Sequence, residues 1–241
     1  MNDTAKKSAD GNLLAATVLT HIRKMIATGQ LKQGERVKEL DISQTLGISR
    51  GPVREAVRRL SASGLLVSAT NMGSRVLVLT EATVRQAYQV REVLESLGAQ
   101  LAAENMSAAE RRDLLRMLDE HEEVMRTEEP NTYPAGDSDW DFHLKILKGA
   151  RNEFVWRICG EELRDIMSLM RAQHRSTAQR GMRALQEHRW VAEAISDGNS
   201  DLASVLMAQH IRASRDSLLT GIKTGTAIAQ GTGSRKGDSA T

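Results

Sequence analysis

The sequence predicts a mostly α-helical protein in two parts: three helices with a β-hairpin, followed by an all-α antiparallel bundle of about six helices. The composition favours helices, because the 241 residues include only 3 Pro and 18 Gly. Apolar residues recur at the i, i+3, i+4 and i+7 spacing of amphipathic helices. Charge also divides the chain, with 12 Lys and Arg against 6 Asp and Glu up to residue 79, and 21 against 25 afterwards.

Four segments are predicted from this division. Residues 1–11 are small and polar and are expected to form a flexible arm, 12–79 a basic domain, 80–223 a helical domain, and the Gly-, Ser- and Thr-rich residues 224–241 a disordered tail. A basic part joined to an acidic part is typical of a nucleic-acid module attached to another kind of domain. With one cysteine and no signal peptide or long apolar run, we expect a soluble, cytoplasmic protein that makes no intramolecular disulfide and contacts no membrane.

The first part has the order of elements of a winged helix-turn-helix. A glycine, Gly47, separates the second and third apolar-periodic segments and predicts the tight turn between two helices. The turn signal at 71–74 lies between two short apolar runs and predicts a hairpin. We expect helices over 14–26 and 38–46 and from about residue 50, and strands over 65–67 and 75–79.

The third helix is predicted to be the DNA recognition helix. Its buried face is expected to carry Val53, Ala56, Val57 and Leu60. Arg50, Arg54 and Arg58 lie four residues apart on another face, and Ser49 is placed to cap the helix. Guanidinium groups, a hydroxyl and free backbone amides are donors that the major groove and phosphates accept. The alternative is an arginine-rich surface that contacts only solvent.

The motif around this helix resembles the DNA-binding domain of GntR-family bacterial transcription regulators. The resemblance is carried by Gly34-Glu35-Arg36-Val37, by the run from Leu46 to Val57, and by Leu60 and Gly64-Leu65. It implies that operator contacts are made by Ser49, Arg50, Gly51 and Arg54, although Gly51 replaces the threonine usual in the family and leaves only a backbone amide there. Arg75 on the predicted wing is a further candidate, for a phosphate or the minor groove, or else is an exposed basic residue.

Three histidines of the second part, His143, His188 and His210, lie on predicted amphipathic helices. Asp139 precedes His143 by four residues, so both side chains point to one side of a helix, as two ligands of one metal ion would. One carboxylate and three imidazoles suit Zn²⁺, Ni²⁺ or a similar divalent ion. The alternative from spacing alone is that these histidines are packed or hydrogen-bonded. The predicted helices span 81–104, 107–127, 137–148, 153–171, 177–197 and 200–222.

The second part resembles the helical C-terminal domain of the FadR-type branch of the same family. The resemblance is carried by Asp139 to His143, by Glu187-His188 and by the segment from Ala203 to His210. It implies a cavity in which Asp139, His143, His188 and His210 hold a metal. Asp137 and Asp141 are weaker candidates because they lack the four-residue relation to His143, and His121 and His174 are expected at the surface.

The resemblance further implies a small organic acid as effector, with an arginine pairing with it. Arg91 is the first candidate and Arg171 the second, and the alternative for Arg91 is a simple pair with Glu95 four residues on. We therefore predict a transcription regulator, not an enzyme, that binds two-fold operator DNA as a homodimer and is released as a repressor by an acid bound at the metal. A metal-dependent enzyme and a metal-ion sensor are the alternatives.

Overall fold

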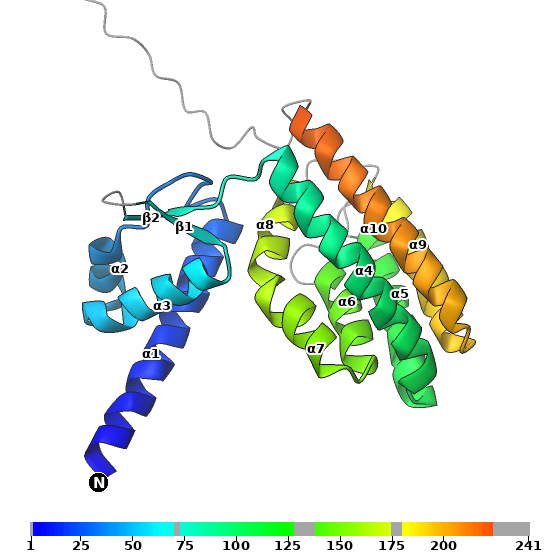
Figure 1. Ribbon diagram of the computed structural model, residues 1–241, viewed down its shortest axis with the longest axis horizontal. Helices are drawn as coiled ribbons and strands as arrows, with labels where there is room; N and C mark the ends of the chain where they lie inside the picture. The colour runs from blue at the N-terminus through cyan, green and yellow to red at the C-terminus, as the bar shows by residue number, and fades with distance from the viewer. Residues whose placement is uncertain (1, 70–72, 128–137, 175–179, 224–241) are drawn as a thin grey trace, which may run out of the picture. The chain divides into compact units, whose positions relative to one another are not determined.

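The computed structural model describes residues 2–69, 73–127, 138–174 and 180–223, which form two compact units. The first unit ends at Val78 and the second begins at Leu79. Within the described residues the protein is mostly helical, with one two-stranded antiparallel sheet (Figure 1). None of the described helices combines the length and hydropathy that crossing a bilayer requires.

The first unit is a winged helix-turn-helix. Helix α3 packs against α1 and α2, and the two strands pair in antiparallel register from Leu66 opposite Val76 to Ala69 opposite Gly73. Its elements are α1 (Asn2–Ala27), α2 (Glu39–Leu46), α3 (Arg50–Ala62), β1 (Leu66–Ala69) and β2 (Gly73–Val76).

The apolar pattern of α3 correctly predicts its buried face, which consists of Val53, Ala56, Val57 and Leu60. Gly47 ends α2 in the left-handed conformation, at φ 63°, where a residue without a Cβ avoids strain. Ser49 occupies the N-cap position of α3 in an extended conformation, but its side chain makes no capping hydrogen bond. The expected serine cap is therefore absent, and the hydroxyl does not stabilise the first turn.

Residues 2–11, which were expected to form a flexible arm, belong to helix α1 instead. This segment contains Ala5, Lys6, Lys7 and Ala9, which have high helix propensity, and only one glycine, Gly11. The apolar residues whose spacing predicts helix α1 begin only at Leu14. A prediction from apolar spacing therefore started the helix too late.

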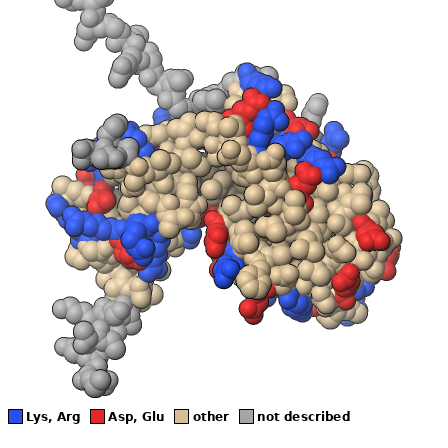
Figure 2. All heavy atoms as spheres, viewed as in Figure 1, with Lys and Arg blue, Asp and Glu red and all other residues tan. Residues whose placement is uncertain are grey.

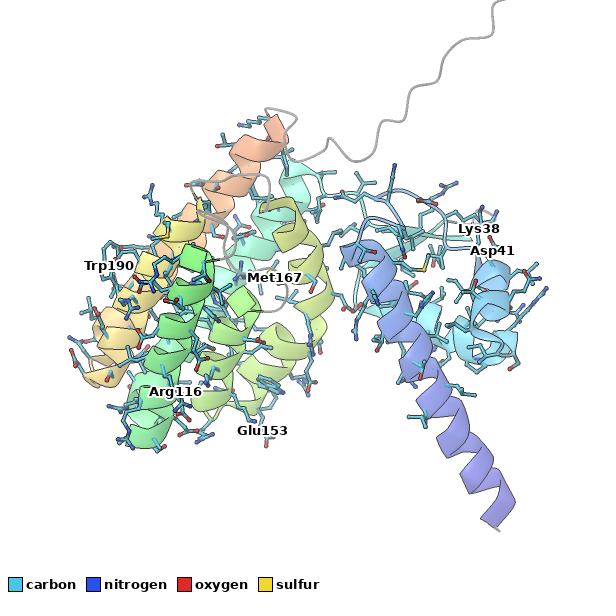
Figure 3. The ribbon with its side chains drawn as sticks, turned by 180° about the vertical axis from the view of Figure 1, so that it is seen from behind. Lys38, Asp41, Arg116, Glu153, Met167 and Trp190 are labelled. Carbon is cyan, nitrogen blue, oxygen red and sulfur yellow. The ribbon has the colours of Figure 1, made fainter. Side chains whose placement is uncertain are left out.

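The second unit is a bundle in which α4 packs along α10 and also contacts α6 and α9. Met167 lies inside this bundle, whereas Trp190 lies on its outer side (Figure 3). The elements are α4 (Glu81–Asn105), α5 (Ala108–Thr127), α6 (Ser138–Gly149), α7 (Glu153–Val155), the π-helix η1 (Trp156–Glu162), α8 (Arg164–His174), α9 (Arg180–Ser196) and α10 (Ser200–Lys223).

The single helix predicted over 153–171 is divided into α7, η1 and α8. Asn152 caps α7, as its sequence position suggests, by accepting hydrogen bonds from the backbone amides of Phe154 and Val155. The middle of the segment is π-helical, and a Cβ at Gly160 would lie 3.0 Å from the Trp156 ring. Apolar spacing does not distinguish this wider winding from an α-helix, so the sequence pattern could not reveal it.

Candidate metal site and DNA-binding surface

Three buried histidines meet inside the helical unit. His143 comes from α6, His188 from α9 and His210 from α10, and each offers a ring nitrogen within 4.8 Å of the other two. The Nε2 atoms of His188 and His210 are 3.2 Å apart. The Phe142 ring stacks on His188, with ring centroids 4.1 Å apart, and holds that imidazole in place. Three predicted ligands from separate helices are thus brought together.

Two of these imidazoles are oriented by a buried carboxylate. His143 Nδ1 is 2.6 Å from Glu95 Oε2, and His210 Nδ1 is 2.9 Å from Glu187 Oε2. A carboxylate at Nδ1 favours the tautomer that carries its proton on Nδ1 and presents the Nε2 lone pair. Both rings therefore keep Nε2 available as a metal ligand.

Each carboxylate is in turn paired with an arginine. Arg91 Nε lies 2.6 Å from Glu95 Oε1, and Arg180 Nη2 lies 2.8 Å from Glu187 Oε2. Burial acts to raise the pKa of Glu95, but the charges and hydrogen bonds of Arg91 and His143 outweigh it and hold that pKa at about 2. The pKa of Glu187 is likewise about 2, because His210 and Arg180 outweigh the effect of burial. Both carboxylates are ionised.

The donor set fits a divalent transition metal. Nitrogens bound to one Zn²⁺ at about 2.0–2.1 Å in tetrahedral geometry lie about 3.3 Å apart. The 3.2 Å separation between His188 and His210 is close to that value, and the third nitrogen is within reach of both. The buried cluster of three histidines could therefore hold a metal ion.

The other predicted residues of this region have mixed outcomes. Asp139 lies on α6 one turn before His143, but its side chain, like that of Arg171 on α8, lies outside the described part of the structure, as does all of Asp137. Asp141 is exposed. His121, expected at the surface, is buried on α5 at 7% exposure, because its face of the helix continues the stripe of Leu114 and Leu118.

Sequence reasoning missed the arginines behind Glu187. Arg180 and Arg183 precede it by seven and four residues on α9, so all three lie on one side of the helix. Arg183 Nε is 3.2 Å from Glu187 Oε1. The four-residue spacing of Arg183 and Glu187 could have indicated an ion pair. The role of Glu187 could be recognised only after the structure placed His210 Nδ1 beside its carboxylate.

The arginines of α3 are exposed. Arg54 is 69% exposed, with its Nε 3.6 Å from Glu39 Oε2, and Arg58 pairs with Glu55. A Cβ at Gly51 would meet nothing closer than 4.0 Å, so a larger residue would fit there. Lys and Arg side chains gather over α2 and α3 on the face shown in Figure 2. A basic surface therefore surrounds the start of α3.

The wing uses its two arginines differently. Arg75 is half-buried and its Nη1 donates to the carbonyl of Gly34, 2.9 Å away, so part of its guanidinium fixes the wing to the preceding loop. A Cβ at Gly73 would lie 3.0 Å from Arg36 Nε, which places the Arg36 guanidinium against the hairpin. Arg36 was noted only as part of a motif, and the structure brings it to the wing.

These features define a winged helix-turn-helix regulator with a separate helical domain, and comparison with known proteins agrees. Residues 14–76 match the family described as bacterial regulatory proteins, gntR family, and residues 86–213 match the FCD domain. The chain belongs to the GntR family of transcription regulators, in the branch that carries an FCD ligand-binding domain.

Named relatives and solved structures support this assignment. The chain is 30% identical to the probable D-xylose utilization operon transcriptional repressor of Paenarthrobacter nicotinovorans, over 88% of this chain and 91% of the relative. It is 27% identical to the regulator LutR of Bacillus subtilis, over 78% of this chain and 93% of LutR. The structure of E. coli McbR/YncC shares the fold with a TM-score of 0.72 at 18% identity, covering 87% of this chain and 98% of that protein.

Proposed function

We propose that the protein is a homodimeric repressor that binds two-fold operator DNA and is released when a small organic acid binds at a metal ion, Zn²⁺, in the helical unit. The observation that carries this proposal is the buried cluster of His143, His188 and His210, backed by two carboxylate–arginine pairs. Asp139, one helical turn before His143, is proposed as the fourth ligand.

The proposed site is suited to a small anion. A bound divalent ion supplies an electrophilic centre that accepts a carboxylate or hydroxyl oxygen. Around it, Glu95 and Glu187 hold the imidazoles, and their charges are balanced by Arg91 and Arg180. Arg91 pairs with Glu95, which supports the alternative in which these two residues bind each other. An effector contact from Arg91 or from Arg171 stays a prediction.

DNA contacts are proposed for Ser49, Arg50, the Gly51 amide and Arg54 at the start of α3. A single winged helix contacts too few base pairs for useful specificity, so two copies are needed on matching half-sites. Effector binding can shift the arrangement of the two DNA-binding units only as far as it favours one arrangement over the other.

The experiment combines elemental analysis of the purified protein with operator-binding assays on its own upstream DNA across a panel of organic acids. We expect about one metal ion per chain and one acid that releases DNA. His188→Ala should lower the metal content and abolish release by the acid while DNA binding persists. Substrate turnover by the purified protein would contradict the proposal, as would release of DNA by metal alone.

A further inference from the structure

The two carboxylates behind the histidines are balanced by different numbers of arginines. Glu95 pairs with one arginine, Arg91, whereas Glu187 lies between two. Arg180 Nη1 and Arg183 Nε donate hydrogen bonds to Glu187 Oε1, over 2.9 Å and 3.2 Å. One negative charge therefore faces two guanidinium groups on this side of the cluster, and among the described residues the second positive charge has no carboxylate of its own.

Only one of these two arginines is buried. The Arg180 side chain is 10% exposed, like that of Glu187, whereas the Arg183 side chain is 75% exposed. Although Arg180 Nη2 lies 2.8 Å from Glu187 Oε2, this buried nitrogen makes no hydrogen bond within the described part of the structure. Such a nitrogen carries two hydrogens, and leaving them buried without an acceptor is unfavourable. An unused buried donor beside a candidate metal site indicates a place for a bound acceptor.

The second arginine would allow Arg180 to change its partner. If Arg180 turned to a ligand, Glu187 would keep its hydrogen bond from Arg183, so its charge would stay balanced. Arg91 has no such substitute, because it donates through Nε and Nη2 to both oxygens of Glu95 and is the one arginine paired with that carboxylate in the described residues. Of the two buried arginines, Arg180 is therefore the one that can turn to a ligand at low cost.

Arg180 and the proposed metal ion lie on different sides of one imidazole. Arg180 approaches Glu187 Oε2, and this oxygen contacts His210 at Nδ1, whereas a metal ion would bind His210 at Nε2. The acidic group bound to the ion is therefore not the group that Arg180 would bind. A small molecule that satisfies both needs two acidic groups.

We propose that the effector is a small dicarboxylate, with one carboxylate on the metal ion and the other on Arg180, and that Arg183 then holds Glu187 in place of Arg180. The inference rests on the proposed function, which requires an acid at the metal, and it names the class of acid and the arginine that selects it. The guanidinium group presents paired N–H donors that match a carboxylate. An acid with a single carboxylate leaves the Arg180 donor unused and binds more weakly.

Two matched pairs of acids test the proposed class. Malate and 2-hydroxybutyrate share the hydroxy acid end and differ in the distal group, which is a carboxylate in the first and a methyl group in the second. The pair of 2-hydroxyglutarate and 2-hydroxyvalerate repeats this comparison in a longer chain. We expect calorimetry on the Zn²⁺-loaded protein to show at least one diacid binding about 10- to 100-fold more tightly than its matched monoacid. Equal affinities within both pairs, or no binding by either diacid, would overturn the proposal.

Variants of Arg180 assign the preference to this residue. Arg180→Gln should lower the affinity for the diacid to that for its monoacid, while the affinity for the monoacid and the metal content stay unchanged. Arg180→Lys keeps the charge but not the paired N–H groups, so it should retain part of the preference. Arg116→Gln removes an exposed arginine of α5 and is the control that should change neither affinity. If Arg180→Gln weakens both acids equally or neither of them, Arg180 does not bind the second carboxylate and the inference fails.

Acid binding and release of operator DNA are measured separately, so the two proposals fail in different ways. A diacid that binds through Arg180 but leaves the DNA complex intact would contradict the proposed function while supporting this inference. A monoacid that releases DNA as well as the diacids do, with an affinity equal to theirs, would support the proposed function and overturn this inference.

Discussion

Arginine–glutamate pairs of nearly equal length occur in both units, but their surroundings differ. On α3, Arg58 Nη2 is 2.7 Å from Glu55 Oε1, and the two side chains are 71% and 33% exposed. Beside the histidine cluster, Arg91 Nε is 2.6 Å from Glu95 Oε1, and the side chains are 6% and 1% exposed. Distance alone would rank the two pairs as equals.

Burial separates them in both energy and role. An exposed ion pair contributes little to stability, because water and salt screen it, so its arginine can exchange a carboxylate for a phosphate. A buried pair cannot lose one member cheaply, because the remaining charge has no water around it. The proposed DNA-binding surface thus keeps its charges exchangeable, whereas the Arg91–Glu95 pair beside the proposed metal site keeps its charges fixed.

The largest expected effect comes from breaking the buried pair. Arg91→Met leaves Glu95 charged inside the bundle and should lower the free energy of unfolding of the helical unit by about 3–5 kcal/mol. All three tryptophans follow residue 79, so urea unfolding followed by tryptophan fluorescence reports on this unit. Arg126→Met, which breaks the exposed pair with Glu123 on α5 of the same unit, is the control and should leave the curve unchanged. Equal unfolding curves for both variants would show that burial does not decide how much an arginine–glutamate pair contributes to stability.

The next effect concerns the carboxylate that orients His210. Glu187→Gln keeps the shape of the side chain but removes the charge that holds the Nδ1 proton, so the proposed metal affinity should fall about 10- to 100-fold. Competition against a chelating dye measures this. Glu193→Gln changes an exposed carboxylate on the same helix and serves as the control. If both variants bind metal like the parent protein, Glu187 has no role in positioning the imidazole.

Sequence alone predicted the parts of the molecule that depend on local pattern. The buried face of α3 follows from apolar residues at helical spacing, and the turn at Gly47 follows from the chemistry of glycine. His143, His188 and His210 were selected because each lies on a predicted amphipathic helix beside an apolar stripe, and the resemblance to the family grouped them.

What the sequence could not supply depends on contacts between distant segments. Glu95 and His143 are 48 positions apart, and nothing local to either residue shows that they touch. Arg75 looked like a free basic residue because the carbonyl that it binds belongs to Gly34, 41 positions earlier. The π-helical turn at Trp156 was hidden for another reason, since its apolar spacing is compatible with an ordinary helix.

Arg54 is one of the exposed arginines, so replacing it should change the affinity for DNA and not the stability of the protein. Arg54→Ala should weaken binding to the operator by about 5- to 150-fold and relax specificity at one base position, if the guanidinium contacts a base edge. Arg116→Ala removes an arginine of similar exposure, 67%, from α5 and is the matched control. Fluorescence anisotropy with labelled operator measures both. Unchanged binding by the Arg54 variant would remove this residue from the DNA contact.

The smallest effect on DNA binding is expected for Arg58, because its guanidinium is paired with the Glu55 carboxylate. Hydrogen bonds from Arg58 and Arg59 lower the pKa of Glu55 to about 2, so the carboxylate stays ionised near neutral pH and competes with phosphate for Arg58.

Arg58→Gln should therefore weaken binding to operator and unrelated DNA alike, lowering the slope of log affinity against log salt by no more than about 1. Glu55→Gln should act in the opposite direction, because it removes the competing carboxylate and leaves both arginines available to the phosphates. Titrations of each variant between 50 and 200 mM salt, about the range in which such contacts change affinity most visibly, distinguish the two signs. If Glu55→Gln weakens binding instead, the carboxylate positions Arg58 for DNA, and the exposed pair is as fixed in its role as the buried one.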